Sequence, residues 1–178
     1  MELTDALFDL CKSVSQPIIA IDGPAGAGKT TLAEHLSAAL SLKYKCSVIH
    51  MDSLYNGWDA PFDHHLKDSL LLAAEAHKNA QAISLPRFDW HSNKFVTGEE
   101  MPPSQLLILE GVGSSQRVIR PYLAATIWID IDPESGLKRV LHRDGDAISQ
   151  QMQQWLIIQE QHFRDEDSKN AADFELTT

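Results

Sequence analysis

Residues 23–30 read GPAGAGKT and constrain the fold of this chain more than any other stretch. They fit G-x-x-x-x-G-K-[ST] at every fixed position, the pattern of a loop that cradles the phosphates of a nucleoside triphosphate. An apolar run at 17–21 predicts a buried strand before the loop, and leucines at helical spacing over 31–40 predict a helix after it. This context favours a phosphate-binding loop over a glycine-rich turn in an unrelated α/β protein.

The residues of this loop have distinct predicted tasks. Its glycines let backbone N–H groups close around phosphate oxygens, because a Cβ would crowd the ligand, and the helix N-terminus adds partial positive charge. We expect Lys29 to reach the β- and γ-phosphates of ATP and the Thr30 hydroxyl to bind Mg²⁺. The predicted nucleotide-binding residues are Gly23, Ala25, Gly26, Ala27, Gly28, Lys29, Thr30 and Thr31.

Length, charge and cysteine content narrow the class of protein. The 178 residues predict one domain, 1–178, with a substantial core. A net charge of −10 argues against nucleic-acid or anionic-membrane partners, but it is compatible with a nucleotide held by a few local cations. No apolar run approaches the roughly 18 residues of a membrane span. Two unpaired cysteines and an acidic start, MELTDALFDL, predict a cytoplasmic protein. The oligomeric state stays open.

The rest of the chain alternates between strand and helix patterns. Further strands are expected at 45–50, 106–109, 125–131 and 174–176, helices at 3–10, 66–77, 133–143 and 148–163, and an irregular or hairpin segment over the site at 83–95. Such alternation predicts an α/β fold in which a mostly parallel sheet of about five strands has helices on both faces.

Two carboxylates follow predicted strands at the edge where open α/β sheets bind ligands. Asp52 comes just after 45–50 and is the best candidate for the base that accepts a proton from a substrate hydroxyl. Glu110 comes directly after 106–109 and could hold Mg²⁺ through a bound water or contact the substrate. Each also has a plainer interpretation, as a carboxylate that only forms a turn at the end of a strand.

Two arginines, Arg139 and Arg143, lie one helical turn apart and point the same way. They could close over the transferring phosphate and stabilise its charge as a lid spanning about 138–150. The alternative is a basic helix C-terminus that interacts favourably with the helix dipole.

The order of these motifs resembles the uridine kinase and phosphoribulokinase group of P-loop kinases. The matching elements are DSLY at 52–55, WDAPFD at 58–63, FDWHSNK at 88–94, LILEGV at 107–112 and the run from Arg139 to Asp144. The resemblance implies a three-layer P-loop NTPase fold and a kinase that uses ATP and Mg²⁺. The chain lacks the Asn-Lys-x-Asp motif of guanine-specific proteins, which also favours ATP. Beyond Asp144 the chain continues Gly-Asp-Ala, without the further arginines of the group.

The resemblance also implies an acceptor site. Asp52 and Tyr55 would contact the acceptor, Asp59 would accept hydrogen bonds from sugar hydroxyls, and the planar base would be framed by Phe88, Trp90 and His91. Each aromatic side chain could instead pack onto the core, and Trp58 shares this ambiguity.

The sequence therefore predicts a uridine kinase-like enzyme that transfers the γ-phosphate of ATP to a hydroxyl of a small molecule, most plausibly a nucleoside. A nucleoside monophosphate kinase ranks lower because it would need several more convergent arginines. A regulator that hydrolyses ATP without a small acceptor is the alternative from another class. Stimulation of ATP turnover by one acceptor from a panel would distinguish these hypotheses.

Overall fold

The computed structural model describes residues 2–178, which form five longer helices and seven strands. The helices are α1 (Leu3–Lys12), α2 (Lys29–Leu40), α3 (His64–Lys78), α4 (Pro133–Asp144) and α5 (Ser149–Glu166). The strands are β1 (Ile18–Asp22), β2 (Cys46–His50), β3 (Pro86–Asp89), β4 (Lys94–Thr97), β5 (Leu106–Glu110), β6 (Ala125–Asp130) and β7 (Phe174–Thr177).

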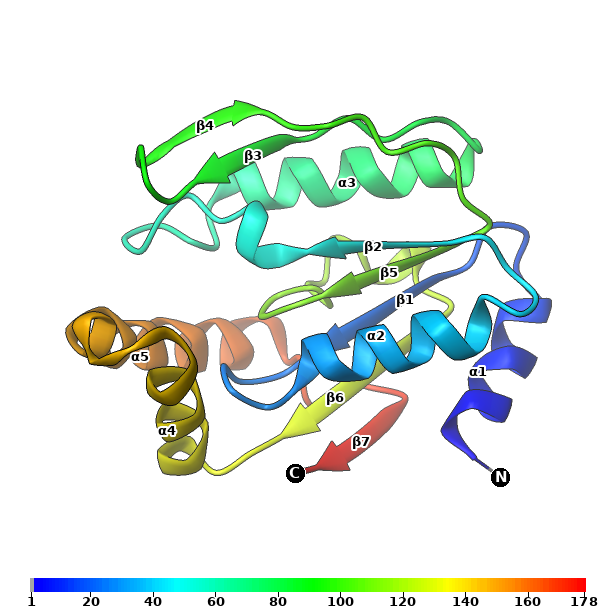
Figure 1. The fold of residues 1–178 in the computed structure, drawn as a ribbon. Coiled ribbons are helices and arrows are strands. Elements are labelled where there is room, and N and C mark those ends of the chain that lie inside the picture. The colour runs from blue at the N-terminus through cyan, green and yellow to red at the C-terminus, as the bar shows by residue number, and fades with distance from the viewer. Residues whose placement is uncertain (1) are drawn as a thin grey trace.

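Five strands build one parallel sheet in the order β2-β5-β1-β6-β7. Their arrows all point toward the end of the molecule where α4 and α5 lie (Figure 1). The predicted α/β class and five-stranded parallel sheet are confirmed. Because all carboxyl ends meet at one edge, the loops that follow β1, β2 and β5 come together there.

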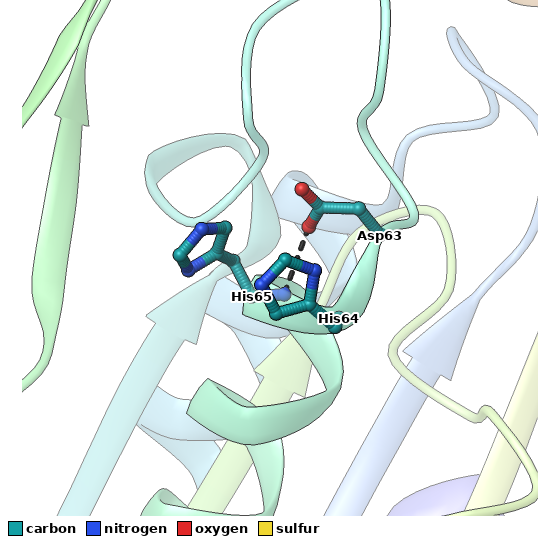
Figure 2. A group of neighbouring side chains, drawn as sticks. All are labelled: Asp63, His64 and His65. Atoms are coloured by element: carbon teal, nitrogen blue, oxygen red, sulfur yellow. Dashed lines mark hydrogen bonds between the residues drawn. The ribbon is translucent and has the colours of Figure 1, made fainter.

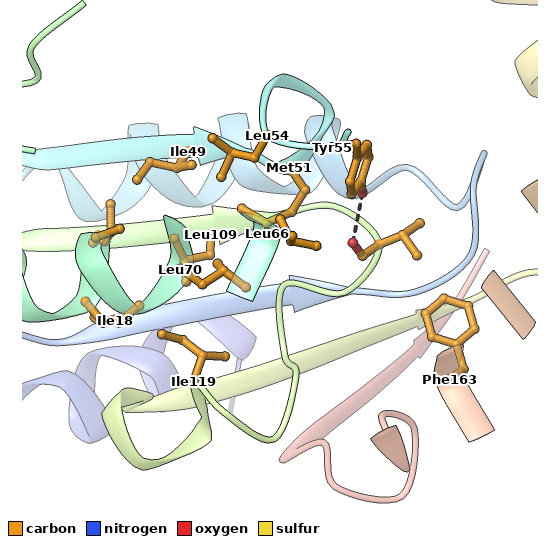
Figure 3. Close-up of a cluster of buried hydrophobic side chains, with 14 of the residues drawn as sticks. Ile18, Ile49, Met51, Leu54, Tyr55, Leu66, Leu70, Leu109, Ile119 and Phe163 are labelled. Carbon is orange, nitrogen blue, oxygen red and sulfur yellow. Dashed lines mark hydrogen bonds between the residues drawn. The ribbon is translucent and has the colours of Figure 1, made fainter. Parts of the chain in front are cut away.

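The sheet contributes side chains to two apolar cores, one on each face, because successive side chains of a strand point to opposite faces. In β5, Leu107 and Leu109 join the core under α3 and α5, part of which Figure 3 shows. Leu106 and Ile108 join the core under α1 and α2. All five residues of β5 are buried, as expected for a central strand covered on both faces. These layers confirm the predicted three-layer arrangement.

The predicted irregular or hairpin segment is a hairpin. Strands β3 and β4 pair antiparallel, with Phe88 opposite Phe95, and form a separate two-stranded sheet above α3 (Figure 1). Its turn carries Trp90 and is closed by the Asp89 carboxylate, which accepts hydrogen bonds from the His91 N–H and the Ser92 hydroxyl. The hairpin thus brings one tryptophan toward the carboxyl ends of the main sheet.

The predicted start of α4 is confirmed, since the Asp132 carboxylate accepts hydrogen bonds from the N–H groups of Glu134 and Ser135. The helix ends at Gly145, whose φ of 90° is unfavourable for residues with a side chain. A short turn at 146–148 then leads into α5. Within residues 2–178 no helix combines the length and the apolar character needed to cross a membrane.

Candidate active site

The glycine-rich loop joins β1 to α2. Two of its glycines are needed to leave room for neighbouring backbone, in addition to the room predicted for the ligand. A Cβ on Gly23 would lie 2.2 Å from the carbonyl oxygen of Ile129, and one on Gly26 would lie 2.3 Å from that of Gly136. The backbone of the loop therefore packs directly against the backbone of β6 and of α4. The sequence predicted glycine here because it leaves space for phosphate. The close packing of the loop backbone is a second reason for glycine at these positions.

Lys29 opens α2 and is buried beneath the loop. Its Nζ donates hydrogen bonds to the carbonyl oxygens of Gly23 and Pro24, each at 2.7 Å. Burial lowers the pKa of Lys29, and the nearby carboxylates of Asp22, Glu110 and Asp52 oppose that shift. The loop therefore holds a cation that is close to acidic groups and shielded from solvent.

A cavity of about 630 Å³ opens over this loop at the carboxyl ends of the strands. The predicted site residues that line it are Ala25, Gly26, Gly28, Lys29, Thr30, Thr31, Asp52, Tyr55, Trp90, Glu110, Arg139 and Arg143. The predicted residues outside its lining are Gly23, Ala27, Asp59, Phe88 and His91. The structure thus brings the two carboxylates, the lysine and both arginines to one cavity.

Glu110 lies at the junction of three elements. The Thr30 hydroxyl donates to Glu110 Oε1 at 3.2 Å, and His50 Nδ1 lies 2.5 Å from the same oxygen. The hydrogen bond to Glu110 raises the pKa of His50. A hydroxyl and a carboxylate side by side are hard oxygen ligands of the kind Mg²⁺ prefers, so these two residues fit the predicted metal site. Sequence reasoning missed His50, although it ends β2 two residues before Asp52.

Asp52 lies in the short turn after β2, where it lines the cavity and keeps contact with solvent. Burial, and then the charge of Glu110, raise the pKa of Asp52, while Lys29 and Arg143 oppose the shift. Its backbone oxygen accepts a hydrogen bond from Trp90 Nε1 at 2.9 Å. A carboxylate of raised pKa is a better proton acceptor than an ordinary aspartate.

The two arginines reach the cavity from α4 with different partners. Arg143 makes a two-pronged ion pair with Asp144, at 2.7 and 2.6 Å, which raises the pKa of Arg143. Arg139 Nη1 lies 3.4 Å from the Gly26 carbonyl oxygen and 3.2 Å from Thr178 Oγ1. Both side chains are exposed, so they can rearrange over a phosphate without breaking the core.

An aromatic wall also lines the cavity, formed by Tyr55, Trp58, Trp90 and Trp155. Ring centroids lie 5.2 Å apart for Trp58 and Trp90, 5.9 Å for Trp58 and Trp155, and 5.0 Å for Tyr55 and Trp155. These are edge-on contacts of the kind aromatic rings favour. The Tyr55 hydroxyl donates to the Val112 carbonyl oxygen at 2.8 Å (Figure 3), so this ring is fixed.

One side chain links this wall to the loop. Gln159 Oε1 accepts hydrogen bonds from Trp155 Nε1 at 3.0 Å and from the Ala25 N–H at 3.1 Å. Gln159 is buried, so both bonds are shielded from water. The sequence predicted the helix at 148–163 but gave Trp155 and Gln159 no part in the site. A polar residue on an otherwise apolar face was the available indication of a special role.

The remaining predicted acceptor residues take other places. Phe88 is buried and contacts Trp90 and Phe95 edge-on, both at 5.2 Å between ring centroids, so it supports the tryptophan from behind. His91 is exposed in the hairpin turn, and Asp59 is exposed in the loop before α3. Phe88 faces inward because it pairs with Phe95 across the hairpin, and the plainer interpretation of core packing therefore describes this residue.

Comparison with known families adds to this geometry. The sequence profile of the AAA domain matches residues 19–161, which is most of the chain. The chain belongs to the AAA domain family. No curated protein sequence matches it.

Solved structures with the same fold as this AAA domain chain include kinases of several kinds. A possible uridine kinase from Bacillus stearothermophilus is 21% identical with a TM-score of 0.63, over 99% of this chain and 100% of the other. A candidate fructose transport system kinase from Silicibacter sp. is 20% identical with a TM-score of 0.66, over 98% of both chains. A shikimate kinase from Bacteroides thetaiotaomicron is 14% identical with a TM-score of 0.50, over 90% and 85%. These likenesses establish the P-loop kinase fold.

Three further residues of the chain, left without a role by the sequence, lie outside the cavity lining. Lys169 forms ion pairs with Asp130 and Glu175, each at 2.8 Å, and so ties β6 to β7. His162 is buried and stacks on Phe62 with ring centroids 4.1 Å apart. Glu160 is exposed on α5.

Proposed function

We propose that this AAA domain protein is a kinase that transfers the γ-phosphate of ATP to a hydroxyl of a small molecule. The observation that carries the proposal is the shared cavity, in which the Asp52 carboxylate lines the same space as Lys29 and Arg143. Phosphoryl transfer needs cations around the phosphates and an acceptor-side group that orients the attacking hydroxyl, and this cavity offers both.

The donor half of the cavity would bind ATP. The loop N–H groups and Lys29 would hold the phosphates, and Arg139 and Arg143 would approach them from α4. Thr30 and Glu110 would hold Mg²⁺, and the bound ion would neutralise phosphate charge. Arg143 would have to exchange part of its ion pair with Asp144 for phosphate oxygens, which its exposure allows.

The acceptor half would position the hydroxyl and take its proton. Asp52 would accept a hydrogen bond from the hydroxyl and then hold its proton, a task that its raised pKa favours. The indole of Trp90 donates to the backbone oxygen of Asp52 and so helps to fix where this turn sits.

The aromatic wall supports a nucleoside as the acceptor. Trp58 and Trp90 are accessible and offer apolar faces and edges against which a planar base can stack, while Tyr55 and Trp155 are buried and support them. Among the described residues, the cations that line the cavity are Lys29, Arg139 and Arg143, which belong to the loop and to α4. A phosphate-bearing acceptor would therefore meet no cation on the wall, so we favour a hydroxyl acceptor over a nucleoside monophosphate. The name of the Bacillus relative, a possible uridine kinase, points the same way.

The free thiols Cys11 and Cys46 suit a reducing compartment, so we place this activity in the cytoplasm.

The test is ATP turnover by the purified chain with a panel of nucleosides, nucleoside monophosphates, sugars and vitamins. We expect one nucleoside to stimulate ADP formation and to appear as an equal amount of its monophosphate by mass spectrometry. Stimulation only by a nucleoside monophosphate would overturn the choice of a hydroxyl acceptor. Slow hydrolysis that no member of the panel changes would overturn the kinase and favour an ATP-hydrolysing regulator.

A further inference from the structure

A second group of reactive side chains lies outside the cavity lining, at the start of α3. Asp63, His64 and His65 are consecutive, and a ligand atom from each lies within 4.8 Å of the other two (Figure 2). Both imidazoles are exposed, and the carboxylate is partly buried. This arrangement belongs to no part of the phosphotransfer proposed above and is independent of it.

The carboxylate of this group is held in place. Asp63 Oδ1 accepts a hydrogen bond from the His65 N–H at 2.9 Å, and Oδ2 accepts one from Asn56 Nδ2 at 2.8 Å. A carboxylate has about four lone-pair sites, so each oxygen can still bind a further partner. Fixing the carboxylate in advance lowers the entropy lost when a ligand binds.

The two imidazoles are available. Within residues 2–178, the hydrogen bonds made by imidazole nitrogens belong to His50 and His77. The rings of His64 and His65 lie 4.2 Å apart between centroids, and the His65 ring packs against Phe95 at 5.2 Å. The two imidazoles can therefore turn toward one point without giving up a hydrogen bond.

The spacing is close to that of a metal site. Three atoms that all lie within 4.8 Å of one another lie within about 2.8 Å of a common point, since the limiting radius is 4.8 divided by √3. Zinc binds imidazole nitrogen and carboxylate oxygen at about 2.0–2.2 Å. The exposed rings of His64 and His65 can close the remaining gap, a fraction of an ångström, by small rotations of the side chains. Two imidazoles and one carboxylate suit Zn²⁺ better than Mg²⁺, which prefers oxygen ligands.

We propose that Asp63, His64 and His65 bind a zinc ion, with water completing the coordination. The partial positive charge of the α3 N-terminus opposes a cation, and the Asp63 carboxylate at the same position offsets it. The Asn56–Asp63 hydrogen bond closes the loop that carries Trp58, and an isolated pairing of Asn56 with Ala60 lies inside that loop. A metal on Asp63 would thus fasten the base of the loop that supplies part of the aromatic wall.

The direct test is zinc titration of the full chain without a histidine tag, by calorimetry in excess Mg²⁺ to keep the Thr30–Glu110 position filled. We expect one zinc per chain, at least about tenfold weaker binding in H64A and in H65A, and loss in the double variant. The matched control is the H35A/H142A double variant, which removes two other exposed imidazoles. An unchanged affinity and stoichiometry in H64A/H65A would overturn the site.

A second measurement separates metal binding from folding. Asp63→Asn keeps a residue that caps helices well but removes the negative charge, so α3 should persist while zinc affinity falls at least about tenfold. Zinc should raise the melting temperature of the wild-type chain and leave that of H64A/H65A unchanged. Cobalt in place of zinc should give a visible absorption band that the double variant lacks. The absence of both effects in the wild-type chain would equally overturn the proposal.

Discussion

The two halves of the cavity are built in different ways. The donor half comes mainly from one stretch, 25–31, with Glu110 added from the end of β5 and the arginines from a single helix. The aromatic wall comes from separate segments, since Trp58 lies in the loop before α3, Trp90 in the hairpin turn and Trp155 in α5. A contiguous motif carries its own geometry, whereas such a wall exists only once the chain has packed.

The two halves also differ in what holds them. Gly23 and Gly26 lie against backbone carbonyls of β6 and α4, where no side chain can be inserted without moving main chain. The tryptophans contact one another through rings, and rings can be exchanged for others of similar size. Substitutions in the donor half should therefore abolish the reaction, and those in the wall should change acceptor affinity.

The largest effect is expected from Lys29→Ala. Removing a cation that stabilises the transferring phosphate should lower kcat by about 10³–10⁵-fold. Turnover with the best acceptor from the panel would measure it, with Lys78→Ala on the exposed end of α3 as the control. Because Lys29 is buried, circular dichroism must show that the variant is folded. A folded variant within tenfold of wild type would remove Lys29 from the donor half.

Asp52→Asn should come next, because it keeps the shape of the side chain and removes the base. We expect kcat to fall by about 10²–10⁴-fold while binding of ATP stays within twofold. Calorimetry with a non-hydrolysable ATP analogue measures the second quantity. Near-normal turnover in this variant would mean that Asp52 only shapes the turn after β2.

The same carboxylate predicts a pH dependence. Desolvation, and then the charge of Glu110, raise the pKa of Asp52, so protonation begins at a higher pH than for an ordinary aspartate. Only the ionised form can accept the hydroxyl proton, so kcat should fall about tenfold per pH unit below that pKa. The pH profile at saturating ATP and acceptor measures this acid limb. The residual activity of Asp52→Asn should lack it, and an identical limb in that variant would assign the titration to another group.

The sequence predicted most of the fold because the responsible patterns are local. Strand patterns, the clearest of them the apolar runs before the loop and at 106–109, marked the five parallel strands, and Asp132 followed by Pro133 marked the start of α4. The order of strands in the sheet was not predicted, since nothing within β5 says that it separates β1 from β2. Register and neighbours depend on contacts between residues far apart in the chain.

The same limit applied to the site. Glu110 ends β5, Asp52 lies in the turn after β2, and Lys29 and Thr30 follow the loop after β1. Their arrival at one edge could therefore be predicted from topology alone. Phe88 illustrates the opposite case. It was expected to frame a base, yet pairing with Phe95 buries it behind Trp90. Residues of the wall depend on which way a hairpin and a helix face, and periodicity does not specify that.

Trp58→Ala tests whether the wall acts on the acceptor alone. Losing one stacking surface costs about 1 kcal/mol at the lower end of measured values, so KM for the acceptor should rise about fivefold. Both kcat and the KM for ATP should stay within twofold, because Trp58 belongs to the aromatic wall and not to the nucleotide-binding loop. Trp58→Phe should recover most of the affinity. A change in the KM for ATP equal to that for the acceptor would break the division into two halves.

Gln159→Leu should give the smallest effect and the sharpest test of the comparison, because Gln159 belongs to both halves. Its side-chain oxygen accepts from Trp155 in the wall and from Ala25 in the loop. Each lost hydrogen bond costs about 0.5–1.5 kcal/mol, so the KM values for ATP and acceptor should both rise about threefold. Gln159→Glu keeps an acceptor oxygen at the same position but introduces a buried charge. It should recover one or both KM values. If only the KM for the acceptor moves in Gln159→Leu, the link to Ala25 has no energetic weight and the two halves act separately.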